Sequence, residues 1–63
     1  MTTRTFTTLE AACDVCFALN QWGARRNGGA TIALRDGKTV TLRPEYTSKE
    51  TLREFASLAG AFE

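Results

Sequence analysis

Apolar residues recur every three or four positions in two segments of the chain, which is the spacing of one face of an α-helix. The first segment predicts a helix over about residues 8–22, and the second predicts a helix over about residues 48–62. The first helix has a wide apolar arc, made of Leu9, Ala12, Cys13, Val15, Cys16, Leu19 and Trp22. The second has a narrower stripe, made of Leu52, Phe55, Ala56, Ala59 and Phe62, with Leu58 at its edge. We therefore expect the first helix to be covered on more sides than the second.

Both helices follow the same short pattern, FTTLE at residues 6–10 and YTSKE at residues 46–50. A threonine hydroxyl can accept a hydrogen bond from the backbone amide three residues on, while the glutamate reaches back and the aromatic residue packs on the first turn. At the other end of the first helix, Gly23 can adopt the left-handed conformation that stops a helix. We expect the helix to end there.

Residues 30–43 alternate between apolar and polar and contain an Asp-Gly pair, which predicts a β-hairpin. A two-residue turn at Asp-Gly would divide the four aliphatic side chains between the two faces of the hairpin. A three-residue loop ending at Gly37 would instead pair Leu34 with Lys38 and put all four on one face. Burial on one side favours this second register. The four side chains are Ile32, Leu34, Val40 and Leu42.

The whole chain predicts one α+β domain with the element order (β)αββα. Residues 2–6 are rich in threonine and could add a short third strand at an edge, and Arg43, before Pro44, is held extended and ends the hairpin. With 63 residues the chain has interior enough for a single core over 1–63. We expect a compact single domain with two helices packed on one face of an antiparallel hairpin or three-stranded sheet.

The net charge is +1, but the charges are unevenly distributed along the chain. Residues 22–43 carry five cations against one aspartate, whereas the two flanking segments are slightly acidic. The longest wholly apolar run, VCFAL, is far shorter than the ~20 residues of a membrane helix, and the first ten residues lack the apolar core of a secretory signal. We expect a cytoplasmic protein that does not bind membranes.

Two cysteines in the motif CDVC, Cys13 and Cys16, have a spacing with known chemistry. A structural zinc ion needs four ligands, and this chain has two cysteines and no histidine, so a second chain would have to complete the site. A redox dithiol is favoured at a helix start, whereas Cys13 lies well inside the predicted helix. We predict that both are buried core side chains, with an intersubunit metal or disulfide, or redox activity, as alternatives. No metal or cofactor is expected.

Catalytic residues are hard to find in this sequence. There is no histidine, the carboxylates are scattered on the outer faces of the predicted helices, and no serine or cysteine has a base nearby. The stretch GARRNGG follows a helix and precedes a strand, so it does not match the common phosphate-binding loops. We expect a binding protein and not an enzyme.

The candidate binding surface combines the expected loop after the first helix with the basic hairpin. Its residues are Arg25, Arg26, Arg35, Lys38 and Arg43, with Trp22 and Phe17 as apolar anchors. Arginine and tryptophan are enriched at binding hot spots, and arginine can hold carboxylates in two-pronged pairs. The expected partner is a larger protein or nucleoprotein complex with an acidic patch. Phe17 projects to the polar side of its helix, where the N-terminal segment covers it or a partner contacts it.

In its size and its stand-alone start, MTTRTFTTLEAACDVCF, the chain resembles the small inhibitor proteins of phages and mobile elements, of which the anti-CRISPR proteins are examples. This resemblance extends over all 63 residues but involves no shared motif. It implies an inhibitor that occupies a nuclease complex or its nucleic-acid-binding surface. With a charge of +1 the chain lacks the strongly acidic surface of a DNA mimic, which makes steric blocking or allosteric capture the expected mechanism. The alternatives are a nucleic-acid-binding accessory protein that uses the same basic patch and a homo-oligomerisation domain, so we expect a monomer or a homodimer.

Overall fold

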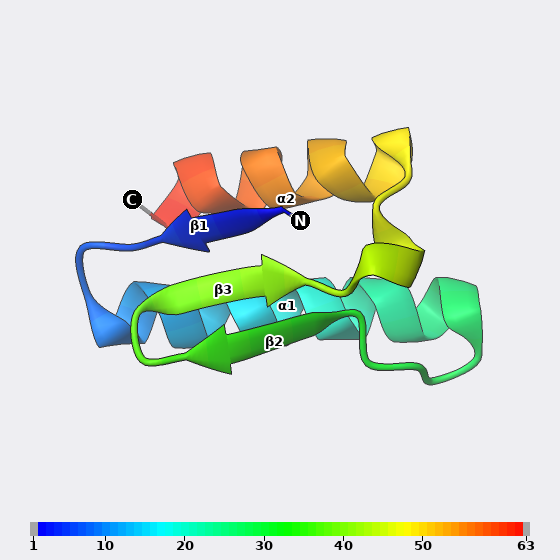
Figure 1. The fold of residues 1–63 in the computed structure, drawn as a ribbon, viewed down its shortest axis with the longest axis horizontal. Coiled ribbons are helices and arrows are strands. Elements are labelled where there is room, and N and C mark those ends of the chain that lie inside the picture. The colour runs from blue at the N-terminus through cyan, green and yellow to red at the C-terminus, as the bar shows by residue number, and fades with distance from the viewer. Residues whose placement is uncertain (1, 63) are drawn as a thin grey trace.

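The computed structural model describes residues 2–62 as one α+β domain (Figure 1). The elements follow in the order β1 (Thr3–Thr5), α1 (Leu9–Asn27), β2 (Ala33–Asp36), β3 (Thr39–Leu42), a 3-10 turn (Pro44–Tyr46) and α2 (Lys49–Phe62). The three strands form an antiparallel sheet in the order β1-β3-β2, and both helices pack on one face of it. The predicted fold class is confirmed, and the threonine-rich start does form an edge strand.

The first helix is capped one residue later than the FTTLE pattern suggests. Thr8 Oγ1 accepts a hydrogen bond from the backbone N–H of Ala11 at 3.1 Å. In a capping box the glutamate stands three residues after the cap, and that position is taken here by Ala11 and not by Glu10. Phe6 lies just outside this helix and is buried in the core.

The second helix shows the same shift of one residue. Ser48 Oγ accepts a hydrogen bond from the backbone N–H of Thr51 at 3.4 Å, and the two hydroxyls lie 3.0 Å apart. Thr47, the cap suggested by the spacing to Glu50, instead donates to the carbonyl of Pro44. Glu50 is therefore free of the capping role and can interact elsewhere.

The predicted end of the first helix at Gly23 is wrong. The helix continues to Asn27, and Gly28, with φ of 66°, is the left-handed residue that ends it. Gly23 has a different role, since it is buried and a Cβ built on it would lie 2.7–2.9 Å from atoms of the Ile32 side chain. The glycine lets the segment before β2 approach α1 closely. The sequence pattern alone does not distinguish a glycine needed for close packing from one that ends a helix.

The predicted hairpin register is also wrong. Asp36 pairs with Thr39 and Ala33 with Leu42, so the turn consists of Gly37 and Lys38. Gly37 has φ of 61° while Lys38 has a negative φ, which is the arrangement of a type II′ turn. Neither register considered from the sequence placed the turn at these two residues.

The observed register changes which side chains face the helices. Ala33 shares the inner face with Val40 and Leu42, and Leu34 lies on the outer face, where its side chain is 55% exposed. Ala33 is small enough to lie beneath α1. Ile32 is buried as well, against Gly23 and just before the strand begins.

The core lies between the sheet and the two helices. Its fully buried larger side chains are Val15, Leu19, Ile32, Val40 and Leu42, joined by Phe55 from α2. The outer face of the sheet is lined by threonines, with Oγ1 atoms 3.2 Å apart in the Thr3–Thr41 pair and 3.0 Å apart in the Thr5–Thr39 pair. That face is mainly polar, with Leu34 as an exposed apolar side chain.

Candidate binding cleft

The five cations of the basic middle segment do not converge on one surface. Arg25 and Arg26 lie in the last turn of α1, and Arg43 follows β3, which ends near them. Lys38 lies in the β2–β3 turn and Arg35 in the strand leading into it. Figure 1 places that turn and the end of α1 at opposite ends of a molecule whose longest extent is 29 Å. The expectation of one basic patch is therefore wrong. The segment with Arg25 and Arg26, which we expected to be a loop, is the end of α1.

Two of these cations are paired with carboxylates of the chain itself. Arg26 forms an ion pair with Glu50 at the start of α2, and Arg43 Nη2 lies 3.0 Å from Glu45 Oε2 in the 3-10 turn. The Arg35 guanidinium donates to the backbone carbonyl of Gly37. Within residues 2–62, Arg25 and Lys38 are exposed and form no ion pair with another side chain.

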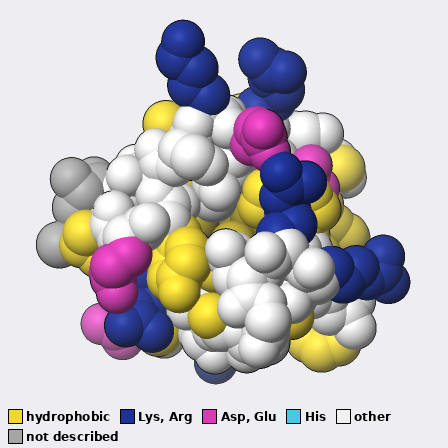
Figure 2. All heavy atoms as spheres, turned by 90° about the vertical axis from the view of Figure 1, so that its right-hand side faces the viewer, with side chains coloured by type: hydrophobic (Ala, Val, Ile, Leu, Met, Phe, Trp, Pro, Cys, Tyr) yellow, Lys and Arg dark blue, Asp and Glu magenta, His cyan; other side chains and the backbone are white. Residues whose placement is uncertain are grey.

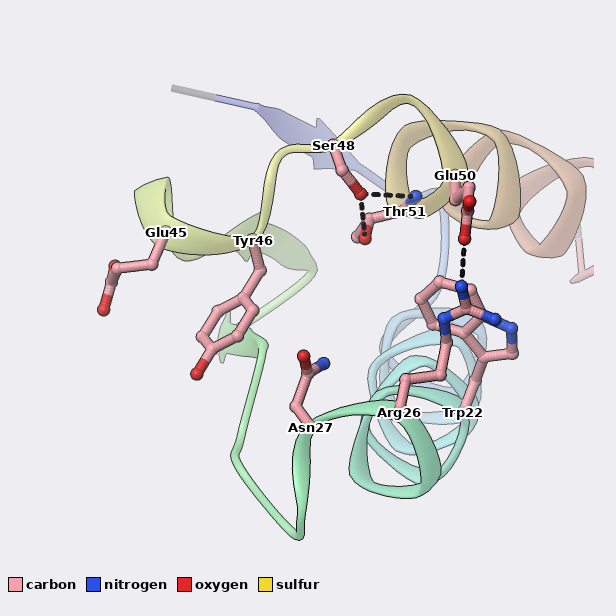
Figure 3. A pocket seen from close by; sticks show the side chains of 8 residues that line it. All are labelled: Trp22, Arg26, Asn27, Glu45, Tyr46, Ser48, Glu50 and Thr51. Atoms are coloured by element: carbon pink, nitrogen blue, oxygen red, sulfur yellow. Dashed lines mark hydrogen bonds and ion pairs between the residues drawn. The ribbon is translucent and has the colours of Figure 1, made fainter.

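A cleft of about 570 Å³ opens where the end of α1, the 3-10 turn and the start of α2 meet. Figure 3 shows the ring of Tyr46 on one side, the stacked Trp22 and Arg26 on the other, and Asn27 between them at the base. The lining residues are Trp22, Arg26, Asn27, Glu45, Tyr46, Ser48, Glu50 and Thr51. The end of α1 thus meets two consecutive elements from much later in the sequence, and the three together build one site.

The Trp22 wall of the cleft carries a cation–π contact. The guanidinium carbon of Arg26 lies 5.0 Å from the centroid of the Trp22 ring, within the range of a favourable interaction. Trp22 and Arg26 are four residues apart on α1, so the helix brings them to the same side. Because Arg26 also reaches Glu50, it connects α1 to α2 across the mouth of the cleft.

Asn27 and Tyr46 complete the polar lining. Asn27 Nδ2 donates to the carbonyl of Gly23 at 3.0 Å, which leaves its side-chain oxygen facing the opening. Tyr46 is half-buried, with its ring packed against the core. Figure 2 views this end of the molecule and shows carboxylates interleaved with lysines and arginines around exposed apolar atoms. The surface carries charges of both signs and is not a basic patch.

Phe17 belongs to a different surface. Its side chain is 66% exposed, so the described N-terminal residues do not bury it. Five residues of α-helix correspond to about 500°, so Phe17 and Trp22 project about 140° apart. The two predicted anchors therefore cannot serve one small contact together.

The cysteines lie on the flank of α1 that faces β2. Both are free and half-buried, so the prediction of fully buried core side chains is only partly met. Burial raises the pKa of the Cys16 thiol, against the lowering influence of nearby Arg35. The Cys16 thiol donates to the carbonyl of Ala33 at 3.7 Å. Among residues 2–62, no three cysteine, aspartate or glutamate side chains are grouped so that they could hold a metal ion.

Asn20 has a role that the sequence reasoning missed. Its side-chain oxygen accepts hydrogen bonds from the backbone amides of Ile32 and Ala33, each at 2.9 Å, and its nitrogen donates to the carbonyl of Ala33 at 3.1 Å. A side-chain amide thus occupies part of the open edge of β2, where another strand could otherwise pair. An asparagine beside the apolar arc of a helix was the available signal.

The cleft residues contributed by the YTSKE stretch were also missed. Tyr46, Ser48 and Glu50 were interpreted only as a helix start, because the pattern carried no information about a facing element, and Thr51, which follows the pattern, was not singled out. The spacing of Thr47 to Glu50 fits a capping pattern, so the sequence carried no local signal that this glutamate would face α1.

Comparison with known proteins gives no relative for this chain. No protein-family model matches it, and neither a curated protein nor a solved structure matches it. Within residues 2–62, neither helix combines the length and the apolar character that crossing a bilayer requires.

Proposed function

We propose that the chain is a non-enzymatic protein-binding module whose docking surface is the end of the molecule around the cleft. The observation that carries the proposal is the meeting of two partly exposed aromatic rings, Trp22 and Tyr46, with charged groups from three separate elements. Aromatic residues and arginine are the types that contribute most at protein interfaces. A concave site with such a lining offers an anchor point to a protruding side chain.

Arg25 is the cation best placed to meet an acidic group of the partner. It is exposed, it precedes the cleft residue Arg26 in the last turn of α1, and no carboxylate of the described chain neutralises it. Arg26 and Arg43, in contrast, already have internal partners. The proposed interface thus uses Arg25 for the acidic side of the partner and the cleft for a protruding side chain.

Within this proposal, the resemblance to phage and mobile-element inhibitors suggests an inhibitor of the anti-CRISPR kind that blocks a host nucleoprotein complex. The surface of mixed charge supports contact with a protein component of such a complex. Blocking by occupation of a protein surface needs a rigid presenting scaffold, and the cleft is built on two helices that pack on each other. A nucleic-acid-binding role through one continuous basic patch loses its support, because the cations lie at two ends.

The proposal is tested by capture followed by binding measurements. The tagged chain is used to capture proteins from a bacterial lysate with and without nuclease, and the affinity of each captured partner is then measured for two charge-reversal variants. Arg25→Glu is expected to weaken binding by about 2 kcal/mol, because it places like charges face to face. Lys38→Glu, at the opposite end, is the matched control and should leave the affinity unchanged.

Two results would contradict the proposal. Equal effects of both variants would remove the cleft end from the interface. Loss of every captured partner after nuclease treatment would favour nucleic acid as the ligand. Reversal of Arg26 is avoided because a new carboxylate there would face Glu50 and disturb the fold.

A further inference from the structure

The Trp22 wall of the cleft is occupied by a guanidinium group of the chain itself. Arg26 lies over the ring at 5.0 Å and is paired with Glu50, so an aromatic face and a carboxylate together hold one arginine side chain. Both members of the ion pair remain more than half exposed, at 52% and 65%. An exposed ion pair is weak, so this internal occupant can be displaced at low cost.

The other groups facing the cleft are suited to a second cation. The Tyr46 ring forms the opposite wall, the Asn27 side-chain oxygen lies at the base, and Glu50 stands at the mouth. Ring faces carry negative electrostatic potential, and amide and carboxylate oxygens accept hydrogen bonds. Arg26, Glu45 and Glu50 give the lining residues a formal charge of −1, which Arg43 offsets through its ion pair with Glu45. The two ring faces and the oxygen acceptors, and not the net charge, therefore favour a cationic occupant over an anionic one.

Arginine fits this lining better than lysine. A guanidinium is planar, so it can stack between or upon rings while its N–H groups reach oxygens at the edge. The internal Arg26 already adopts this arrangement on Trp22, which demonstrates that the wall accepts the group. Tyr46, on the opposite wall, has no such cation stacked on it within the described residues.

We propose that the cleft is a binding site for an arginine side chain of a partner protein, and that Arg26 is an internal competitor that leaves the Trp22–Glu50 pair when the partner's arginine enters. This inference rests on the proposed function, because it names the chemistry that the docking surface recognises. Removal of a cation that contributes to an interface weakens binding, whereas removal of the competitor Arg26 should strengthen it.

The test uses the full chain labelled with ¹⁵N and N-acetyl-arginine N′-methylamide as the probe. Because Trp22 is the one tryptophan of the sequence, its indole N–H signal reports directly on the cleft. The probe should shift this signal saturably, with a dissociation constant on the order of millimolar, as expected for one side chain. The citrulline analogue, which has the same shape but no charge, should cause no saturable shift.

Four variants separate this mechanism from a general attraction of cations. Arg26→Gln is expected to tighten probe binding about threefold to sixfold, because the competing stack and ion pair are removed. Glu50→Gln should weaken it about threefold or more. Lys38→Gln, at the far end of the molecule, should leave it unchanged. Arg26→Ala, which also removes the competing guanidinium, should tighten probe binding in the same way as Arg26→Gln. The dispersion of the amide signals shows whether each variant is folded.

The proposal is overturned if the citrulline analogue binds as well as the arginine probe, or if removal of Arg26 weakens binding. Failure of this inference can be told apart from failure of the proposed function. If the probe does not bind but Arg25→Glu still reduces the affinity for a captured protein, the docking surface stands and its arginine specificity is wrong. If the probe binds as expected but Arg25→Glu and Lys38→Glu affect the captured protein equally, the arginine site stands and the interface lies elsewhere.

Discussion

The two ends of the molecule both carry cations from the basic middle segment, and both depend on a glycine, but for different physical reasons. At the hairpin end, Gly37 has a positive φ and nothing lies within 4 Å of a Cβ built on it. At the cleft end, Gly23 is an ordinary helical residue with no space for a Cβ beside Ile32. The first glycine is required by backbone conformation and the second by packing.

This difference extends to what each end can bind. The hairpin end presents Lys38 and Arg35 beside a two-residue turn. Its aromatic side chain, Phe6, whose backbone amide donates to the carbonyl of Lys38, is buried in the core and offers no ring to a partner. The cleft end joins three elements, so that aromatic rings, cations and carboxylates lie together. Positive charge in a stretch of sequence is therefore not by itself a binding site. A site arises where the fold adds apolar and oppositely charged groups to that charge.

The largest effect is expected from Gly37→Val at the hairpin end. A β-branched L-residue at positive φ is strained, and the free energy of unfolding should fall by about 2–3 kcal/mol. Urea unfolding monitored by the fluorescence of Trp22 measures the loss. The control is chemically synthesised protein with D-alanine at position 37, which suits positive φ and should be at least as stable as the parent. If the D-alanine protein were less stable than the parent, the glycine at position 37 would be required by lack of space and not by its backbone conformation.

A smaller effect is expected from Gly23→Ala at the cleft end. The added methyl group meets the Ile32 side chain, which costs about 1–3 kcal/mol, while better helix propensity returns up to about 1 kcal/mol. The net loss of about 1–2 kcal/mol is measured in the same unfolding experiment. Gly60→Ala is the matched control within α2, where nothing lies within 4 Å, and it should be neutral or stabilising. Equal effects at both positions would contradict the packing role of Gly23.

The smallest effect is expected from the ion pairs of the cleft end. A double-mutant cycle with Arg26→Gln and Glu50→Gln should give a coupling energy of about 0.5–1 kcal/mol, since the pair is exposed. The corresponding cycle with Arg43→Gln and Glu45→Gln, whose members are two residues apart, should give less. A larger coupling for the second pair would mean that Arg26 does not hold α1 to α2.

Much of the fold followed from hydrophobic periodicity and helix signals. Both helices, the hairpin and the edge strand are present, because a repeat of 3.6 or 2 residues is a local property. The hairpin register was missed, because the argument assumed that Leu34 must be buried. In the fold it is Ala33 that lies beneath α1, with Asn20 bonded to its backbone, and Leu34 faces outward.

The candidate site was predicted only in part. Trp22, Arg25 and Arg26 were singled out from their residue types, and Trp22 and Arg26 do lie in the cleft beside Arg25. The expectation that Arg35 and Lys38 join them failed, because a hairpin that starts near the end of α1 must carry its turn to the other end. Tyr46 and Glu50 were missed because their importance depends on which element they face.

The sequence alone determined the class of the fold, its two helices and its hairpin, and the residue types available for binding, since these depend on local periodicity and composition. The tertiary structure decided where α1 ends, which face each strand residue takes and which charges meet. Those outcomes depend on contacts between segments distant in the chain, such as Gly23 with Ile32 and Arg26 with Glu50. Such contacts form when a close approach or an ion pair is sterically allowed, and no one-dimensional pattern encodes that condition.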